Sequence, residues 1–276
     1  MTANELYRFC LKELSFTDCG NFEASCIFED ILNISKNDLI TKNLQVTNQQ
    51  VELVKSLIYQ RKKGRPLQYI LGKWDFYDMS FFVGEGVLIP RPETEMLVDL
   101  ALDSIKNIQN PIIFDLCAGS GCVGLTVAKH RPDSKVYLFE KEDKAYEYLE
   151  RNTEKYSLTN AYPKKCDIFS YGFSDLPKAD VLLSNPPYIK TEEIPSLQRE
   201  VLNEPVSALD GGSDGLDFYR CIYDKWLKTV AAGGFLAFEC GDGQGQEICN
   251  IFKPKTVSQK IIFDFNNIDR IVTFRI

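Results

Sequence analysis

The chain has 276 residues, 44% of them hydrophobic and 26% charged, with a formal net charge of −7. These values are typical of a globular protein with one large domain or two unequal ones, and no apolar run approaches the roughly 18 residues of a membrane span. The acidic balance also argues against a protein that grips long stretches of nucleic-acid backbone, because such binding depends on clustered lysine and arginine.

Residues 1–72 have a helical pattern. Leu6 and Cys10 recur at helical spacing, and Thr47 is placed to cap a second amphipathic helix. The basic run 61–65 is interpreted as a solvated helix end, where cations favour the helix dipole. A docking patch for an acidic or RNA-bound partner is the alternative.

A β-hairpin is expected over residues 73–93. Two strand-like stretches, 76–83 and 86–89, flank Gly84 and Glu85. The change from helical to strand-like pattern predicts that this hairpin links two domains.

From residue 94 to residue 276, near-continuous apolar strands alternate with helices. This pattern predicts an α/β domain with a Rossmann-like, mostly parallel sheet covered on both faces. Too little chain separates the last two strands for a crossover, so they should form an antiparallel hairpin at the sheet edge. The strand candidates are 112–116, 136–140, 161–166, 181–184, 235–239, 260–265 and 270–276, and the helices are 94–106, 123–130, 145–155 and 216–230.

Cysteine and histidine usage narrows the possible chemistry. The nine cysteines show no CxxC pair, so we expect reduced thiols with neither a metal site nor a disulfide scaffold. The N-terminus lacks a signal-peptide layout, and a cytoplasmic protein is expected. The single histidine, His130, precedes Arg131-Pro132 at a predicted helix end, where a histidine base would be badly placed.

A glycine loop follows the buried strand 112–116. Cys117-Ala118-Gly119-Ser120-Gly121 lies between that strand and a helix, and its glycines permit a tight turn and close approach by a ligand. Glu140 ends the next strand, where a carboxylate can accept hydrogen bonds from ribose hydroxyls.

Three interpretations of this loop are open. Gly119, Gly121 and Gly124 match the spacing of NAD-binding loops, and a purely structural turn is also possible. Asp115 favours S-adenosylmethionine, because a carboxylate would face the pyrophosphate of NAD but suits a ligand that carries an ammonium and a sulfonium.

Asp167 follows the third strand. It is a candidate acceptor for the adenine amino group, with Ile168 or Phe169 against the ring; the alternative is an aspartate that caps the next turn. The residues expected to bind the cofactor are Asp115, Cys117, Ala118, Gly119, Ser120, Gly121, Glu140, Asp167, Ile168 and Asn185.

Asn185-Pro186-Pro187-Tyr188 directly follows the apolar strand 181–184, at the strand end where open α/β sheets bind ligands. Asn185 offers an amide oxygen, Pro187 restricts Pro186 so that nearby carbonyls are held in one direction, and Tyr188 adds a flat ring. Together they suit a planar NH2 group, as on adenine, cytosine, asparagine or glutamine.

As a set, these motifs resemble those of class I S-adenosylmethionine-dependent methyltransferases. The segments 66–72, 88–95, 204–215 and 233–239 are in addition similar to the bacterial PrmC/HemK family of release factor glutamine methyltransferases. The resemblance extends over almost the whole chain from residue 66.

The resemblance implies a substrate and roles for the residues. The substrate is the glutamine of a Gly-Gly-Gln motif in peptide-chain release factors, and the product is N5-methylglutamine. Asn185 and the Pro186 carbonyl accept the two amide N–H bonds, and Tyr188 packs on the amide plane, so Asn185, Pro186 and Tyr188 are the catalytic candidates. Residues 1–72 recognise the release factor, the enzyme acts as a monomer, and neither nucleic acid nor a membrane is bound.

The chain also departs from the family pattern. Cys117-Ala118 replaces a common Gly-Thr pair, Glu140 replaces a more common aspartate, and Ile168 replaces a frequent aromatic residue. The segment after Gln246 is short, which predicts a trimmed closing edge of the sheet.

Two rival functions use the same residues. An adenine-N6 DNA or RNA methyltransferase could use the same tetrapeptide, but the acidic balance and small helical domain argue against it. A binding module that has lost its chemistry is disfavoured, since Asp115, Gly119, Gly121 and Asn185 are all present.

Overall fold

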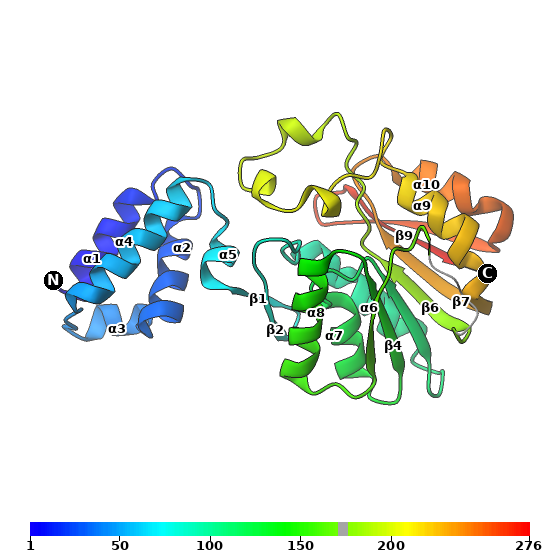
Figure 1. The fold of residues 1–276 in the computed structure, drawn as a ribbon, viewed down its shortest axis with the longest axis horizontal. Coiled ribbons are helices and arrows are strands. Elements are labelled where there is room, and N and C mark those ends of the chain that lie inside the picture. Colours follow the sequence, from blue (N-terminus) through cyan, green and yellow to red (C-terminus); the bar gives the residue numbers. More distant parts are fainter. Residues whose placement is uncertain (171–175) are drawn as a thin grey trace. The chain divides into compact units, whose positions relative to one another are not determined.

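The computed structural model describes residues 1–170 and 176–276, which divide into two compact units (Figure 1). The first unit contains residues 1–73 together with the short segment 198–203, and the second contains residues 74–197 and 204–276. The inclusion of 198–203 in the first unit was not expected from the sequence.

The first unit is built from helices, and three of them begin with a reciprocal capping box. In each box a Thr or Ser hydroxyl at the cap accepts from the backbone three residues on, as Thr47 does from Gln50 at α4. Leu6, Cys10 and Val54 are fully buried in its core. The helices are α1 (Ala3–Glu13), α2 (Gly20–Ile27), a π-helical turn (Phe28–Leu32), α3 (Lys36–Thr41), α4 (Asn48–Lys62) and α5 (Leu67–Leu71).

The interpretation of the basic run as a solvated helix end is wrong for Arg61. The Arg61 side chain is only 3% exposed. Its Nε and Nη2 donate to the two carboxylate oxygens of Glu23 at 2.8 Å each, and Nη2 also donates to Glu200 at 2.5 Å. Asn203 donates to the Gly64 carbonyl at 3.1 Å. These bonds fasten the segment 198–203 to the helical unit.

A hairpin is present, but its predicted strands are wrong. It consists of β1 (Lys73–Phe76) and β2 (Met79–Phe82), whose turn lies at Tyr77 and Asp78, and residues 86–89 form no strand. Tyr77 adopts a left-handed backbone with φ of 57°. Its N–H donates to Glu95 at 2.7 Å, so a tertiary contact holds a turn that the apolar run 76–83 concealed.

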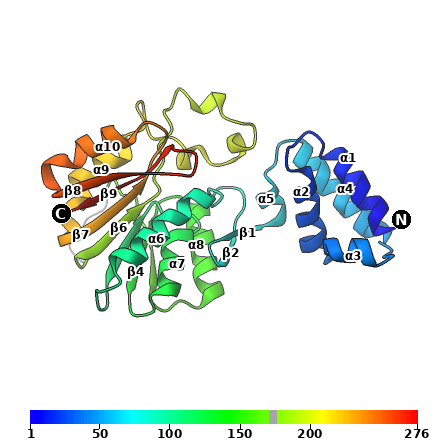
Figure 2. The same ribbon diagram turned by 180° about the vertical axis from the view of Figure 1, so that it is seen from behind.

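The second unit contains a seven-stranded sheet in the order β5-β4-β3-β6-β7-β9-β8 (Figures 1 and 2). The first five strands in this order are parallel, and β9 pairs antiparallel with both β7 and β8, which confirms the predicted edge hairpin. The strands are β3 (Ile112–Leu116), β4 (Lys135–Glu140), β5 (Ala161–Lys165), β6 (Ala179–Ser184), β7 (Val230–Glu239), β8 (Ser258–Phe263) and β9 (Asp269–Arg275).

Alternate residues of the strands feed two separate cores. Ile113 packs with the helices of one face and Phe114 with those of the other, as expected for a parallel sheet covered on both sides. The first face carries α6 (Glu95–Ser104), α7 (Cys122–His130) and α8 (Asp143–Tyr156), and the second carries α9 (Asp217–Cys221) and α10 (Gly245–Phe252).

Two further expectations are corrected. The predicted helix 216–230 is α9 followed by a π-helical turn at Ile222–Trp226 and a 3₁₀ turn at Leu227–Thr229. The sheet is not trimmed at its closing edge, because all seven strands are present. None of the helices in the part of the chain that the structure describes is long and apolar enough to cross a membrane.

Candidate active site

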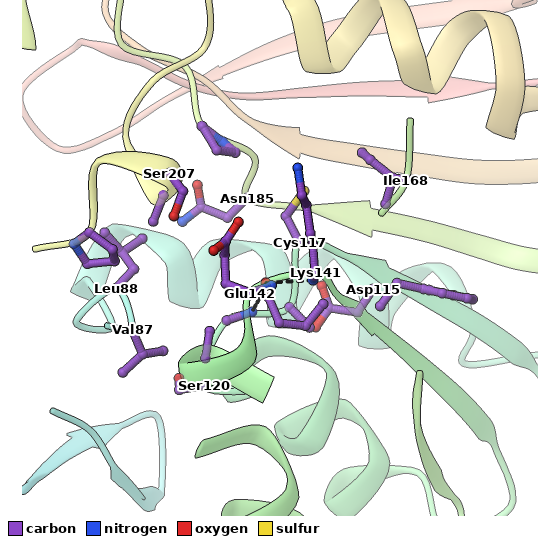
Figure 3. Close-up of a pocket in the computed structure, with 18 of the residues that line it drawn as sticks. Val87, Leu88, Asp115, Cys117, Ser120, Lys141, Glu142, Ile168, Asn185 and Ser207 are labelled. Atoms are coloured by element: carbon purple, nitrogen blue, oxygen red, sulfur yellow. Dashed lines mark hydrogen bonds between the residues drawn. The ribbon is translucent and has the colours of Figure 1, made fainter. Parts of the chain in front are cut away.

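A cavity of about 470 Å³ lies at the carboxyl ends of the parallel strands, at the point between β3 and β6 where the strand order reverses. Open α/β sheets bind their ligands at this topological switch point. In Figure 3, labelled side chains from several separate loops project into this space. Of the residues expected to bind a cofactor, the wall contains Asp115, Cys117, Ala118, Gly119, Ser120, Glu140, Asp167, Ile168 and Asn185.

The two glycines of the loop face different surroundings. A methyl group added at Gly119, whose φ is 56°, would meet only Val87 at 3.9 Å, and both residues line the cavity. At Gly121 the added atom would lie 2.5 Å from Leu149 and 2.8 Å from Leu125. We expected a ligand to approach Gly121, but this glycine is required by packing at the start of α7 and is not on the wall.

Glu140 connects the glycine loop to the end of β4. Its Oε2 accepts from the Gly119 N–H at 2.8 Å, and its Oε1 accepts from Lys141 and Glu142 at 2.7 and 2.8 Å. The side chain is buried, which raises its pKa although these bonds favour the charged form. Glu140 therefore shapes the loop and also presents a carboxylate on the cavity wall.

Asp115 lies at the end of β3 and is 2% exposed. Its Oδ2 accepts from the Gly124 N–H of α7 at 2.9 Å. Burial raises its pKa to about 7. A cation in the cavity would stabilise the charged form of this group.

Asp167 has partners of its own within the protein. Its Oδ1 accepts from the Phe169 N–H at 2.9 Å, which is the turn-capping geometry weighed as the alternative for this residue. Its other oxygen lies 3.2 Å from the Lys141 ammonium. Ile168 is buried on the same wall.

Only part of the tetrapeptide 185–188, which follows β6, lies on the cavity wall. Asn185 and Pro187 line the cavity, whereas Pro186 and Tyr188 are not part of its wall. The Asn185 amide nitrogen donates to the Thr94 hydroxyl at 3.2 Å, and the Tyr188 hydroxyl donates to Glu239 at 3.3 Å.

Two segments singled out by resemblance, 88–95 and 204–215, were given no role, but both contribute to the wall. They supply Arg91, Thr94 and Ser207, among others, and the neighbouring Val87 also lines the cavity. Glu204, 4% exposed, joins the segments because it accepts from the Ile89 N–H at 3.0 Å and pairs with Arg91. A contact between residues so distant in the chain leaves no periodic signal in the sequence.

The described residues contain no cluster of metal ligands, and the single histidine is not on the cavity wall. No group of three or more His, Cys, Asp or Glu side chains could hold a metal within residues 1–170 and 176–276. His130 is exposed at the end of α7, as predicted, and its ring nitrogen lies 3.0 Å from Asp78.

The fold and site together define a Rossmann-like methyltransferase. Residues 94–214 match the "Methyltransferase small domain" family. The structure is similar to the hMettl16 catalytic domain in complex with MAT2A 3'UTR hairpin 1, with a TM-score of 0.60 and 12% identity over 92% of this chain and 89% of that chain. At this identity the likeness concerns the fold alone.

Comparison with sequence relatives shows which family of methyltransferases the chain belongs to. Residues 6–72 match the PrmC N-terminal domain. A release factor glutamine methyltransferase of Thermodesulfovibrio yellowstonii is 40% identical over 91% of this chain and 90% of its own length. One from Clostridium acetobutylicum is 36% identical over 82% of this chain and 83% of its own. The chain belongs to the family of release factor glutamine methyltransferases.

Proposed function

We propose that this protein methylates the side-chain amide nitrogen, N5, of the glutamine in the Gly-Gly-Gln motif of peptide-chain release factors, with S-adenosylmethionine as methyl donor. The observation that carries the proposal is the position of Asn185 and Pro187, which lie on the same cavity as the Gly119 loop and Glu140. An amide-binding motif and a nucleoside-binding loop thus share one space. The names of the curated relatives support this substrate.

The residues of the wall fit S-adenosylmethionine. The space beside Gly119 is open, and the carboxyl groups of Asp115 and Glu140 suit a cationic ligand with ribose hydroxyls. The bound group would supply an electrophilic methyl on a sulfonium. We propose that residues 117–120 contact the cofactor, that Glu140 binds its ribose, and that Asp167 and Ile168 contact its adenine.

Asn185 and Pro186 would prepare the substrate amide. An amide nitrogen is a poor nucleophile, because its lone pair is delocalised into the carbonyl. The Asn185 side-chain oxygen and the Pro186 carbonyl would accept its two N–H bonds, which fixes the nitrogen's direction and stabilises the positive charge that develops on it. Tyr188 would support the amide plane. No strong base is needed, since the proton can leave after transfer.

The two parts of the chain would divide the work. We infer that residues 1–72 recognise the body of the release factor, that residues 73–93 form the linker, and that residues 94–276 carry out the chemistry. The protein would act as a monomer in the cytoplasm, without binding nucleic acid directly.

The test offers the purified protein and labelled methyl donor four acceptors separately: a release factor, the same factor with the motif glutamine changed to alanine, adenine-containing DNA, and adenine-containing RNA. Label on the intact factor alone, located on the glutamine by peptide mass spectrometry, is expected. Label on nucleic acid, or equal label on the altered factor, would overturn the proposal.

A further inference from the structure

A hydrogen-bonded chain runs from Asn185 through Thr94, both on the cavity wall, to a buried carboxylate. The Asn185 Nδ2 donates to Thr94 Oγ1 at 3.2 Å, and Thr94 Oγ1 lies 2.6 Å from Glu239 Oε2. Tyr188 donates to the other oxygen of Glu239 at 3.3 Å. Thr94 and Glu239 are 2% and 1% exposed, so each of these buried polar groups needs a hydrogen-bond partner.

The charge of Glu239 determines the direction of every bond in this chain. An ionised carboxylate only accepts hydrogen bonds, so Thr94 must give it the single hydroxyl proton. Thr94 can then only accept from Asn185, which places the amide nitrogen of Asn185 against Thr94. The amide oxygen of Asn185 takes no part in this chain, and Asn185 is one of the residues that line the cavity.

We propose that Thr94 and Glu239 are positioning residues that fix which end of the Asn185 amide is presented to the substrate. This inference rests on the proposed function, because an acceptor oxygen is needed only if the substrate offers N–H bonds. The opposite orientation would present an NH2 group to the substrate's NH2 group. Two donors would then face each other, and the amide could not be held.

Protonation of Glu239 would remove the constraint. A neutral carboxyl can donate to Thr94, which could then donate to Asn185 and stabilise the reversed amide. Burial raises the pKa of Glu239 to about 6, so the charged form dominates at neutral pH and is lost as the pH falls through that value. The titratable or charged groups around this carboxyl are Glu93, Cys122, Tyr188, Tyr219, Cys240 and Arg270.

Threonine variants give the first test, with turnover measured on a release factor at saturating cofactor. Thr94→Val keeps the shape but removes the hydroxyl, and turnover should fall about tenfold to a hundredfold. Cofactor affinity, measured by calorimetry with S-adenosylhomocysteine, should fall much less than turnover, since valine keeps the shape of Thr94 on the cavity wall. Thr94→Ser restores the hydroxyl and should recover most of the activity.

Thr229→Val is the matched control. Thr229 is also buried, and its hydroxyl donates to the Trp226 carbonyl at 2.7 Å, away from the cavity wall. Its turnover should stay near wild type. The inference is overturned if folded Thr94→Val keeps full turnover, or if Thr94→Val and Thr229→Val lower it equally.

Glu239→Gln tests the direction of the bonds and keeps the inference open to refutation if Thr94→Val does not fold. A glutamine oxygen can accept from Thr94 at any pH, so the loss of turnover that Glu239 causes near pH 6 should disappear; any loss that remains belongs to Asp115, whose pKa is raised to about 7. An unchanged acid limb in this variant would overturn the inference. Failure of the wild-type protein to methylate the factor would instead overturn the proposed function, and the two failures are thereby distinguished.

Discussion

Replacement of Arg61 by methionine should destabilise the helical unit strongly. Arg61 makes three charge-assisted hydrogen bonds, two to Glu23 and one to Glu200. Glu23 is 6% exposed, whereas the Glu200 side chain is 48% exposed and can regain water. The cost therefore comes mainly from Glu23, which is left as a buried charge without a partner; such losses amount to about 3 to 5 kcal/mol.

The assay is native-state hydrogen exchange of the α4 amides, because a chain with two units need not unfold in a single step. A loss of about 3 kcal/mol corresponds to exchange on the order of a hundredfold faster. Lys62→Met is the matched control. Lys62 is the next residue of the same helix, and its ion pair with Glu13 is partly exposed, so its loss should change exchange little.

A double variant separates burial from pairing. Arg61 Nη1 is buried and makes no hydrogen bond in the described part of the chain, so the ion pair is incompletely satisfied. Arg61→Met combined with Glu23→Met removes both charges and should recover much of the stability lost in the single variant. The reasoning is refuted if Arg61→Met and Lys62→Met accelerate exchange equally, or if the double variant is less stable than Arg61→Met.

Four further predictions concern the proposed site and the division of labour. Gly119→Ala should weaken S-adenosylhomocysteine binding in calorimetry and lower the melting temperature only by the strain of a left-handed backbone, with φ of 56°. Gly121→Ala should lower the melting temperature more, since its φ is 83° and its methyl also meets Leu149; the reverse order would contradict these orientations. Asn185→Ala should lower turnover about a hundredfold at nearly unchanged cofactor affinity. His130→Ala, at an exposed helix end, should leave turnover unchanged, and an inactive but folded variant would require a histidine base. A chain of residues 73–276, which keeps the whole hairpin and Ile89, should bind cofactor but methylate intact release factor poorly, and equal turnover would refute the division of labour.

The sheet could be predicted because burial on both faces leaves a strong signal. Strands 112–116 and 181–184 are near-continuous apolar runs, and the structure confirms both of them. The predicted ends of helices and strands were wrong where tertiary contacts override the local sequence pattern. Tyr77 turns the hairpin because Glu95 binds its N–H. The strand β7 begins at Val230 rather than Phe235, and its pairing with β6 shifts register between Ala179 and Val181. Two adjacent glycines in this part of β7 concealed the early start of the strand.

The cavity could be predicted to the level of its loops, because the carboxyl ends of parallel strands meet at one edge. The orientation of groups within the loops could not. Gly119 and Gly121 are equivalent in a motif, yet one faces the cavity and the other packs against Leu149. The direction of the Asn185 amide depends on Thr94 and on Glu239, which is 145 residues from Thr94 in the chain.

Glu204 illustrates why resemblance identified segments whose role could not be derived from the sequence. Its carboxylate accepts from the Ile89 N–H, 115 residues away, and pairs with Arg91. A charged group with 4% exposure needs such partners, so removing either side would leave a buried polar group unsatisfied. Residues on both sides of this contact line the same cavity. The two segments therefore depend on each other structurally, because they share a single buried carboxylate whose contacts no local sequence pattern reveals.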